Sequence, residues 1–413
     1  MKQVKPFVIS KREVWQAYKQ VKANRGAAGV DGETIDQFEQ DLSKNLYRLW
    51  NRLSSGSYLP RPVRRVEIPK SDGKTRPLGI PTVADRIAQM VVKNILEPQL
   101  EPIFHRNSYG YRPNRSAHEA VGCVRQRCRN IDWVVDLDIK GFFDNIDHEL
   151  LMRAVRKHTD CRWVLLYIER WLTAPVQMPD GSLVTNTGKG TPQGGVISPL
   201  LANLFLHYAF DRWMDKHFPD LPFARYADDV ICHCFSKTQA NMLRRAVQKR
   251  LAECKLELHP DKTKIVYCKD EARRGRHPVY KFDFLGFEFR PRWVRNRQRG
   301  TIFARFTPAV SPKACKTMRQ TIRSWRLHLQ TGSSLDEVVQ RIRPILNGWI
   351  QYYGRFNRGL LINALATINL YLVRWAMRKY KRLRYSYAKG WQWMMRLCAR
   401  QPDLLPIWLP SQG

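Results

Sequence analysis

The sequence predicts an α+β fold, and three kinds of pattern support this prediction. Apolar residues recur with helical periodicity in several segments, such as 11–23 and 82–100. Shorter segments alternate as strands do, most clearly Val230 to Phe235. The pair Asp72-Gly73 is typical of a hairpin turn. With 413 residues, 44% of them hydrophobic, the chain can form two or three domains with a sizeable core.

The elements can be predicted in chain order. Helices are expected at residues 11–23, 35–53, 82–100, 150–172, 199–213 and 238–254. A capping box at Ser116 to Glu119 opens another helix, and a second one at Ser334 to Glu337 opens a helix in the last third. Strands are expected on both sides of Asp72-Gly73 and at 133–139, 223–235, 263–267 and 282–289, with Ala227-Asp228-Asp229 at a hairpin tip.

The net charge of +35, from 71 basic and 36 acidic residues, indicates a polyanionic partner. A lipid surface is the rival to nucleic acid, but no apolar run reaches transmembrane length, and the longest, Leu360 to Met377, is interrupted by polar residues. We therefore expect no membrane. The first ten residues have no signal-peptide core, and the nine cysteines include no Cys-x-x-Cys pair. These features favour a reducing, intracellular compartment without structural zinc.

Acidic residues mark the candidate chemistry. Asp228 and Asp229 are adjacent and flanked by apolar segments, and two neighbouring anions repel each other unless a cation lies between them. Asp138 ends an apolar strand, where a sheet would present a metal ligand, and Asp136 competes for this role because it lies on the same strand face. Convergent carboxylates can hold two divalent metals about 3.5–4 Å apart for in-line phosphoryl transfer. An isolated Asp-Asp pair would more often be an ordinary acidic turn.

A set of motifs, in this order, resembles those of bacterial group II intron-encoded reverse transcriptase/maturases, in the short form that lacks an endonuclease domain. The resemblance covers nearly the whole chain, and the ordered set is far more specific than any one motif. The motifs are loop 26–32, Arg76 to Pro81, Tyr109 to His118, Asp138 to His148, Gly190 to Gly195, Tyr226 to Asp229, Leu256 to Lys264, Phe284 to Gly286 and Asn347 to Tyr353.

The resemblance implies a right-hand polymerase whose palm is an antiparallel sheet backed by helices. Residues 1–300 would form the fingers and palm with an N-terminal extension, and residues 301–413 a helical thumb, maturase domain X and basic tail. It also implies that Asp138 and Asp228 bind both of two Mg²⁺ ions, with Mn²⁺ as a substitute. The Ile139 carbonyl would be a further ligand, and Asp229 the third catalytic carboxylate.

The same resemblance implies a nucleotide site. Lys70 and Arg76 match the cations that grip the incoming triphosphate, although alone they would be expected on a solvated hairpin. Phe143 matches the aromatic gate that clashes with a 2′-hydroxyl, whereas Phe142 points the other way and packs. Gln193 matches a residue lining the nucleotide pocket. Lys262 lies near the leaving pyrophosphate or, equally, is a salt-bridged surface lysine.

The last third of the chain is strongly basic. From Pro291 to Gly413 there are 23 Lys and Arg residues against three acids, and seven of the 13 tryptophans, of which Trp349 and Trp375 are expected in the core. We predict that this segment binds RNA through Arg378, Lys379, Lys381 and Arg382, and that Arg112 and Arg115 add further RNA contacts. The segment carries only Cys315 and Cys398, so we expect no zinc-containing endonuclease.

The leading hypothesis is an RNA-directed DNA polymerase of the bacterial cytoplasm that uses an RNA template, a DNA primer and dNTPs. It would also bind its group II intron RNA and assist splicing and mobility. One alternative is a splicing-only maturase, which the intact carboxylates and Gln193 oppose. Another is a reverse transcriptase of the same fold used in antiviral defence or DNA repair. The sequence does not indicate an oligomeric state.

Overall fold

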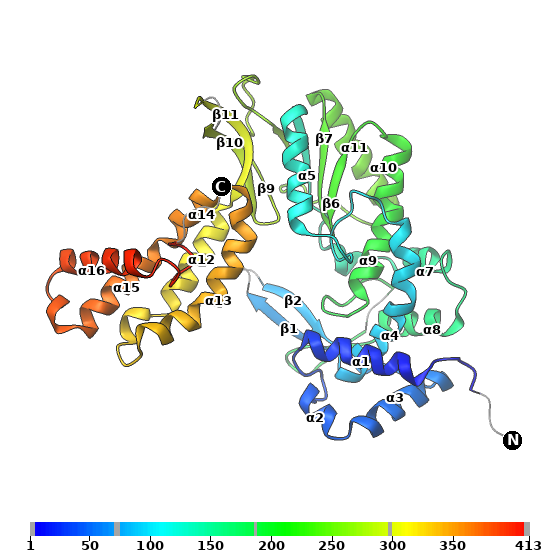
Figure 1. Cartoon of the computed structure of the whole chain (residues 1–413). Helices are drawn as coiled ribbons and strands as arrows, with labels where there is room; N and C mark the ends of the chain where they lie inside the picture. The colour runs from blue at the N-terminus through cyan, green and yellow to red at the C-terminus, as the bar shows by residue number, and fades with distance from the viewer. Residues whose placement is uncertain (1–4, 70–74, 186–187, 296–299, 409–413) are drawn as a thin grey trace. The chain divides into compact units, whose positions relative to one another are not determined.

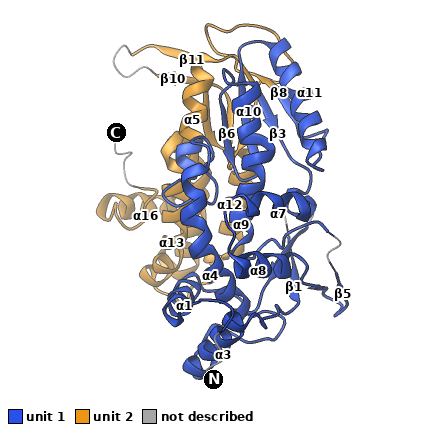
Figure 2. Cartoon of the chain, turned by 90° about the vertical axis from the view of Figure 1, so that its right-hand side faces the viewer, with its two compact units in different colours: residues 1–120, 135–265 blue, residues 121–134, 266–413 orange. Residues whose placement is uncertain are grey.

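The computed structural model describes residues 5–69, 75–185, 188–295 and 300–408 (Figure 1). The chain forms two compact units, shown in different colours in Figure 2. Unit 1 contains residues 1–120 and 135–265, and unit 2 contains residues 121–134 and 266–413. Each unit is therefore built from two separate stretches of chain.

Unit 1 is rich in helices whose starts are fixed by side-chain caps. Ser10 and Glu13 form a capping box on the first helix, and Thr34 and Gln37 form one on the second. The helices are α1 (Lys11–Asn24), α2 (Ile35–Gln40), α3 (Leu42–Ser55), α4 (Val83–Leu100), α6 (Phe142–Asn145), α7 (His148–Arg156), α8 (Arg162–Leu172), α9 (Ser198–Leu206), α10 (Arg212–His217) and α11 (Lys237–Glu253), with a 3₁₀ turn η1 (Glu101–Ile103) and a π-helical turn η2 (His207–Asp211) between α9 and α10.

Two sheets accompany these helices. The first has the order β2-β1-β4-β5 and contains β1 (Val63–Pro69), β2 (Thr75–Ile80), β4 (Val176–Gln177) and β5 (Leu183–Val184). The second has the order β6-β7-β3-β8 and contains β6 (Phe223–Tyr226), β7 (Asp229–Cys234), β3 (Trp133–Leu137) and β8 (Lys264–Tyr267). The division of the chain into the two units falls within β3 and within β8.

Unit 2 consists of one sheet and a bundle of helices. Its sheet, in the order β11-β10-β9, contains β9 (Phe282–Phe284), β10 (Phe287–Arg295) and β11 (Ile302–Val310). Most of α5 (Ala117–Asn130) also belongs to this unit. The remaining helices are α12 (Pro312–Ser324), η3 (Leu327–Leu329), α13 (Leu335–Tyr353), η4 (Gly354–Phe356), α14 (Arg358–Leu365), α15 (Thr367–Lys379), η5 (Lys381–Leu383) and α16 (Tyr387–Arg400).

Several sequence predictions are confirmed. Ser334 and Glu337 form the second capping box at the start of α13, and Ser116 and Glu119 exchange the hydrogen bonds of the first. β1 and β2 pair antiparallel as the arms of the expected hairpin, although the turn Asp72-Gly73 lies outside the described residues. The fold contains both helices and antiparallel strand pairs, as an α+β class requires.

Other predictions were too coarse. The helices expected at 35–53 and 150–172 are each broken in two, by Asp41 and by residues 157–161. The strand expected at 282–289 turns back at Leu285 and Gly286, which both have positive φ, so that Phe284 pairs with Phe287. A side chain at Gly286 would also meet the Tyr353 ring and hydroxyl, at 3.0 Å for the nearest atom. Alternation of apolar residues alone did not reveal these turns.

The predicted domain boundary near residue 300 does not coincide with the division into compact units. Residue 300 lies between β10 and β11, which pair along nine residues from Phe287↔Val310 to Arg295↔Ile302. A boundary there would divide a hairpin. The compact units instead divide at residues 265 and 266, and unit 2 takes in residues 121–134.

The expectation that no segment is apolar enough to cross a membrane also needs correction. Arg358–Lys379 is long enough and apolar enough to cross a membrane, since an 18-residue window within it has a mean hydropathy of 1.4. Of the residues in this window, 44% are buried inside the protein. In the structure this stretch is two helices, α14 and α15, and it contributes Leu361, Leu365, Leu372 and Val373 to the core of unit 2. Its hydrophobicity is thus explained by packing inside the helical bundle.

Candidate functional site

The acidic pair lies at the tip of the β6–β7 hairpin, as predicted. Tyr226 pairs with Asp229, which leaves Ala227 and Asp228 as a two-residue turn. Ala227 has a φ of 55°, a backbone conformation that a residue with a Cβ adopts only under strain. Such a turn needs support from its surroundings.

The support comes from the segment before α5. The backbone N–H of Tyr109 donates to the Arg225 carbonyl at 2.8 Å, and the Arg225 N–H donates to the Asn107 carbonyl at 2.9 Å. Gly110 then crosses the turn so closely that a Cβ there would lie 2.4 Å from the Ala227 nitrogen. Gly110 is therefore required by this approach, which gives a physical reason for the glycine in the motif Tyr109 to His118.

Asp138 directly follows β3, and its charge acts on the two carboxyls of this turn. Desolvation raises the pKa of Asp228, and the charge of Asp138 adds to the rise while Arg76 opposes it. Asp229 keeps part of its surface accessible to solvent, yet the protein around its carboxyl desolvates it. This desolvation, and then the charges of Asp228 and Asp138, raise the pKa of Asp229 to about 7. Asp138 is therefore a strand acid whose charge acts on both carboxyls.

Lys262 forms a salt bridge with Asp138, with Nζ 3.4 Å from the carboxylate, and its side chain is 60% exposed. The Thr263 hydroxyl and the backbone N–H of His259 also contact the Asp138 backbone. Lys262 is thus a salt-bridged surface lysine, as one of the two predicted alternatives states, and its partner is a candidate catalytic acid. The predicted position near the leaving pyrophosphate stays a prediction. In this arrangement Lys262 neutralises part of the acidic charge.

The three carboxylates suit divalent cations. The charge of Asp138 contributes to the raised pKa values of Asp228 and Asp229, so a cation bound between the three groups would stabilise the ionised carboxylates. Within the described ranges, no group of three or more Asp, Glu, His or Cys side chains is arranged to hold a metal ion by itself. Mg²⁺ commonly takes one or two carboxylates and completes its shell with water and substrate phosphates, so this donor set fits a site that is finished by the substrate.

The predicted nucleotide residues Arg76 and Gln193 come together. The Arg76 Nε donates to the Gln193 Oε1 at 2.8 Å, and the Gly79 N–H donates to the Gln193 carbonyl at 2.6 Å. A cavity of about 260 Å³ is lined by Gln193, Leu78 and Lys189, among other residues of unit 1. Lys70 lies outside the described residues, so its predicted role stays a prediction.

Phe143 is placed by the glycine-rich loop. The Thr191 N–H donates to the Phe143 carbonyl at 2.8 Å, and the Gly190 N–H donates to the Ile146 carbonyl at 2.8 Å. Phe142 is buried against Phe143 and Phe205, as predicted. The Phe143 side chain is itself 6% exposed, and its predicted role as the aromatic gate stays a prediction.

Tyr111 is a neighbour of this site that sequence reasoning did not single out. Its ring lies 6.3 Å from that of Tyr226 and is 47% exposed. Desolvation and then the charge of Asp228 raise its pKa, whereas Arg76 lowers it. Its φ of 57° is unusual for an aromatic residue, but a positive φ cannot be recognised from sequence unless the residue is glycine.

The structure gives Arg112 a structural role in place of the predicted RNA contact. Its side chain is 6% exposed, pairs with Glu101 at 2.7 Å and donates to the His105 and Ser108 carbonyls at 2.8 Å. These bonds occupy the guanidinium. Arg115, in contrast, is exposed and lies over the Tyr109 ring, so it remains a candidate RNA contact.

The predicted cations of unit 2 differ among themselves. Arg378, Lys381 and Arg382 are exposed. Lys379 is not available in the same way, because its Nζ donates to the Thr331 and Ser333 carbonyls at 3.0 and 2.6 Å. The prediction that Lys379 contacts RNA is therefore replaced by a structural role in linking α15 to the segment before α13.

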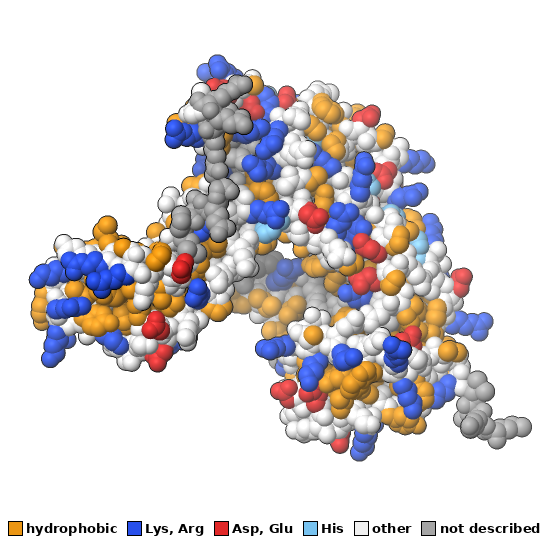
Figure 3. All heavy atoms as spheres, viewed as in Figure 1, with side chains coloured by type: hydrophobic (Ala, Val, Ile, Leu, Met, Phe, Trp, Pro, Cys, Tyr) orange, Lys and Arg blue, Asp and Glu red, His pale blue; other side chains and the backbone are white. Residues whose placement is uncertain are grey.

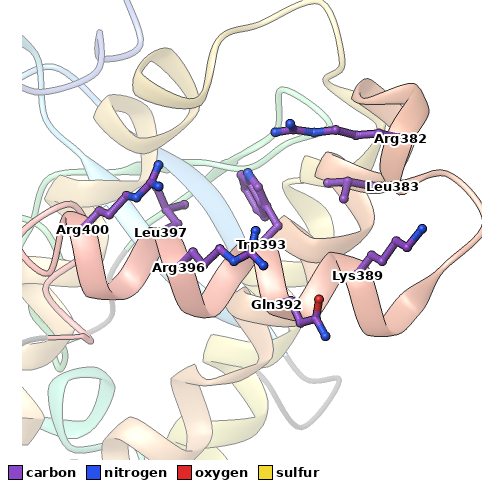
Figure 4. A pocket seen from close by; sticks show the side chains of 8 residues that line it. All are labelled: Arg382, Leu383, Lys389, Gln392, Trp393, Arg396, Leu397 and Arg400. Atoms are coloured by element: carbon purple, nitrogen blue, oxygen red, sulfur yellow. The ribbon is translucent and has the colours of Figure 1, made fainter.

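A basic groove of about 540 Å³ on unit 2 was missed at the sequence level. Its cations Lys389, Arg396 and Arg400 lie along one face of α16, separated by about two turns and about one turn, with Arg382 opposite and the Trp393 ring between (Figure 4). The lining residues are Arg382, Leu383, Lys389, Gln392, Trp393, Arg396, Leu397 and Arg400. Basic side chains also cluster on the visible face of this helix in Figure 3. A second groove is lined by Arg374, Arg378 and Arg384.

The tryptophans expected in the core are largely confirmed. Trp375 is fully buried and donates its indole N–H to the Gln330 carbonyl at 2.9 Å. Trp349 is half-buried and stacks on Trp325, with ring centroids 5.9 Å apart. The helical spacing thus predicted burial correctly for Trp375 and in part for Trp349.

The class of protein follows from unit 1. Its neighbouring carboxylates are suited to bind divalent cations. The Arg76–Gln193 contact lies next to a cavity where a nucleotide could bind. Together these two features are typical of a nucleic acid polymerase. Residues 68–289 match the family Reverse transcriptase (RNA-dependent DNA polymerase), and residues 315–396 match the Group II intron, maturase-specific domain. The chain belongs to the reverse transcriptases of the group II intron type.

Individual relatives agree with this family. Protein YkfC of Escherichia coli (strain K12) is 35% identical over 310 residues, which cover 66% of this chain and 77% of YkfC. Group II intron-encoded protein LtrA of Lactococcus lactis subsp. cremoris is 39% identical over 203 residues, covering 46% of this chain and 32% of LtrA. Putative COX1/OXI3 intron 1 protein of Saccharomyces cerevisiae is 26% identical over 272 residues, covering 65% of this chain and 32% of that protein. The resemblance seen in the motifs is confirmed.

Proposed function

We propose that this protein copies RNA into DNA and also binds group II intron RNA to assist its splicing and mobility. The observation that carries the proposal is the electrostatic grouping of Asp138, Asp228 and Asp229 beside the Arg76–Gln193 contact. The polymerase matches the reverse transcriptase family and the second activity matches the maturase-specific domain. Unit 1 would perform the chemistry, and unit 2 would supply much of the RNA affinity.

In the proposed site, Asp138 and Asp228 hold two Mg²⁺ ions, with Asp229 as the third carboxylate and the Ile139 carbonyl as a further ligand. When bound, the ions would activate the primer 3′-hydroxyl and neutralise charge on the triphosphate. The carboxylates would have to be ionised for this role, and the raised pKa values of Asp228 and Asp229 then mean that protons compete with the ions. Lys262 would exchange its contact with Asp138 for the leaving pyrophosphate.

Arg76 would bind the incoming dNTP through its triphosphate, since a guanidinium fits phosphate oxygens with paired hydrogen bonds. The contact with Gln193 holds Arg76 at the β2 strand, close to the loop that supports Phe143. Lys70 would add a second charge. Phe143 would then exclude ribonucleotides, because its ring would clash with a 2′-hydroxyl.

The RNA-binding surface of unit 2 would be the groove along α16 together with Arg378 and Lys381. Its cations repeat along one helix face, so they can track the phosphates of a nucleic acid strand, and Trp393 offers an aromatic surface among them. Arg115 would contribute from unit 1. Binding of this kind is mainly electrostatic and should weaken steeply with salt.

Two other functions remain as outcomes of the test. A splicing-only maturase is opposed by the carboxylates and the ordered Arg76–Gln193 contact, which such a protein would not need. A role in antiviral defence or DNA repair would use the same polymerase chemistry. Intron RNA structure around the reading frame would favour the intron role over these.

The test is primer extension by the purified protein on an RNA template with a DNA primer, dNTPs and Mg²⁺. Extension that depends on RNA template and on metal is expected. A protein that binds intron RNA and promotes its splicing but never extends a primer would be a splicing-only maturase. A protein that extends the primer but does not prefer its intron RNA over unrelated RNA would point to the defence or repair role.

A further inference from the structure

A fully buried ion pair lies beneath the catalytic hairpin, on residues to which neither the motifs nor the family comparison assigns a role. Arg225 on β6 and Asp211 in the π-helical turn η2 are both 0% exposed. Arg225 donates from Nε and Nη2 to the two Asp211 oxygens at 2.8 and 2.5 Å. This bidentate geometry fixes the plane of the guanidinium.

The remaining nitrogen of the guanidinium reaches the catalytic turn. Nη1 of Arg225 donates to the carbonyl of Ala227 at 3.0 Å and to Oδ1 of Asn203 at 3.0 Å. Ala227 is the strained residue directly before Asp228. The guanidinium therefore ties the turn to a helix in the interior of unit 1.

Asn203 adds a second tie to the same turn. Its Nδ2 donates to the Gly110 carbonyl at 2.7 Å, and Gly110 lies against the Ala227 nitrogen. Asn203 is 1% exposed and lies on α9, before the π-helical turn. The turn is thus held at two points: Arg225 binds the Ala227 carbonyl, and Asn203 binds Gly110, which lies against the Ala227 nitrogen.

The local helix geometry serves this arrangement. A π-helical turn inserts an extra residue relative to an α-helix and is frequent at functional sites. Here it spans His207–Asp211 and ends in the residue that pairs with Arg225. Because a buried ion pair is often no more stable than an apolar replacement, stability alone does not account for placing one here.

We propose that Arg225, Asp211 and Asn203 are positioning residues that hold the strained Ala227–Asp228 turn in the conformation required for metal binding by Asp228. The inference rests on the proposed polymerase function and extends it to residues that contact neither metal nor nucleotide. They act on the reaction only through the placement of the turn. Their loss should reduce kcat and weaken the apparent affinity for Mg²⁺ more than it changes stability.

The test compares four variants with wild type. Asp211→Leu/Arg225→Met removes the whole ion pair and fills its space with apolar atoms, so that folding is retained. Arg225→Lys keeps the charge but lacks the fork that reaches both Asp211 and Ala227. Asn203→Ala removes the second tie. Leu204→Ala, a fully buried neighbour on α9, is the control for destabilisation without loss of these hydrogen bonds.

Primer extension at varied dNTP and Mg²⁺, thermal unfolding and RNA binding are measured for each variant. We expect kcat to fall about tenfold or more and the Mg²⁺ midpoint to rise in the first three variants, as for the loss of residues that orient metal ligands. RNA affinity and the KM for dNTP should stay close to wild type. Leu204→Ala should lose stability while keeping the wild-type Mg²⁺ midpoint.

The proposal is overturned if the variants keep the wild-type Mg²⁺ midpoint, or if kcat falls only in proportion to unfolding, as in Leu204→Ala. If the double variant does not fold, Arg225→Lys and Asn203→Ala decide between the outcomes by the same measurements. Absence of primer extension by wild type would instead refute the proposed function. The two failures are therefore distinguishable.

Discussion

In unit 1 the charged groups of the candidate site are few and individually held, whereas in unit 2 they are many and mostly exposed. Asp228 lies on a turn tied down by Arg225, and Arg76 is hydrogen-bonded to Gln193. From Pro291 to Gly413, 23 cations stand against three acids, and one of those acids, Glu337, caps a helix. We infer from this contrast that catalysis depends on the exact positions of a few charged groups, whereas RNA affinity depends on the total charge of many cations.

The comparison predicts that one substitution in unit 1 has a larger effect than several in unit 2. Asp228→Asn should reduce primer extension by about a thousandfold or more, since it removes an anion where charge must be held for catalysis. RNA binding and thermal stability should persist, and the exposed acid Asp220 changed to Asn gives a matched control. Full extension by the Asp228→Asn protein would refute its assignment as a metal ligand.

Burial also makes unit 1 sensitive to pH in a way that exposed cations are not. Desolvation lowers the pKa of His207 to about 4 from 6.5, so the unfolded chain binds a proton that the folded chain rejects. Stability from this group is complete above pH 6.5 and is lost as pH falls toward 4, by about 3 kcal/mol. Urea unfolding at pH 7 and pH 4 measures the loss.

His207→Phe should show a correspondingly smaller difference between the two pH values, because the ring next to Phe104 and Tyr208 can be replaced by an apolar one. His118, which is more exposed, serves as the control when changed to Phe. An unchanged difference in the His207 variant would mean that other groups carry the acid sensitivity.

The sum of charges in unit 2 can be tested directly. Replacing Arg382, Lys389, Arg396 and Arg400 with Gln should lower intron RNA affinity by about ten- to a hundredfold and flatten the salt dependence, because fewer counterions are released. Extension on a short template should change less. Filter binding across a salt titration is the measurement.

The matched control replaces Arg319, Arg323, Arg326 and Arg341 in the same way, which removes equal charge from outside that groove. Equal losses in both variants would show that total charge, and not the α16 groove, determines binding. In that case the contrast between the units would be even sharper, since position in unit 2 would not matter.

Arg76→Ala should raise the KM for dNTP about tenfold, as expected for loss of a charge-assisted bond to phosphate, with little change in template affinity. Steady-state kinetics on one primer–template gives both constants. Gln193→Ala is informative beside it, since it releases Arg76 without removing the charge. A loss of RNA binding with unchanged nucleotide kinetics would place Arg76 on the template instead.

The smallest effect is expected at Phe143. Phe143→Ala should admit ribonucleotides about tenfold better relative to dNTP, because the steric penalty against the 2′-hydroxyl is removed. Competing incorporation of dCTP and CTP on one primer measures the ratio. Phe142→Ala is the control, and an altered ratio there with none at Phe143 would exchange the roles of the two rings.

The sequence by itself determined the chemistry that was possible. Asp138, Asp228 and Asp229 were predicted as metal ligands from their residue type, and the apolar flanks of the acidic pair predicted the hairpin that the structure contains. The capping boxes and the basic last third were also visible, because each depends on residue types at short spacing. These are local properties, so a single stretch of chain carries them.

Only the tertiary structure decided which cations are free to bind a partner. The side chains of Arg115 and Arg382 carry the same charge as those of Arg112, Lys379 and Arg225. The latter three, however, form hydrogen bonds or ion pairs with carbonyls and carboxylates elsewhere in the chain. The partner of Arg225 is 14 residues away, and that of Lys379 is 46 residues away at its shorter bond. A side chain's type fixes which bonds it can form, but long-range packing fixes which partner it meets.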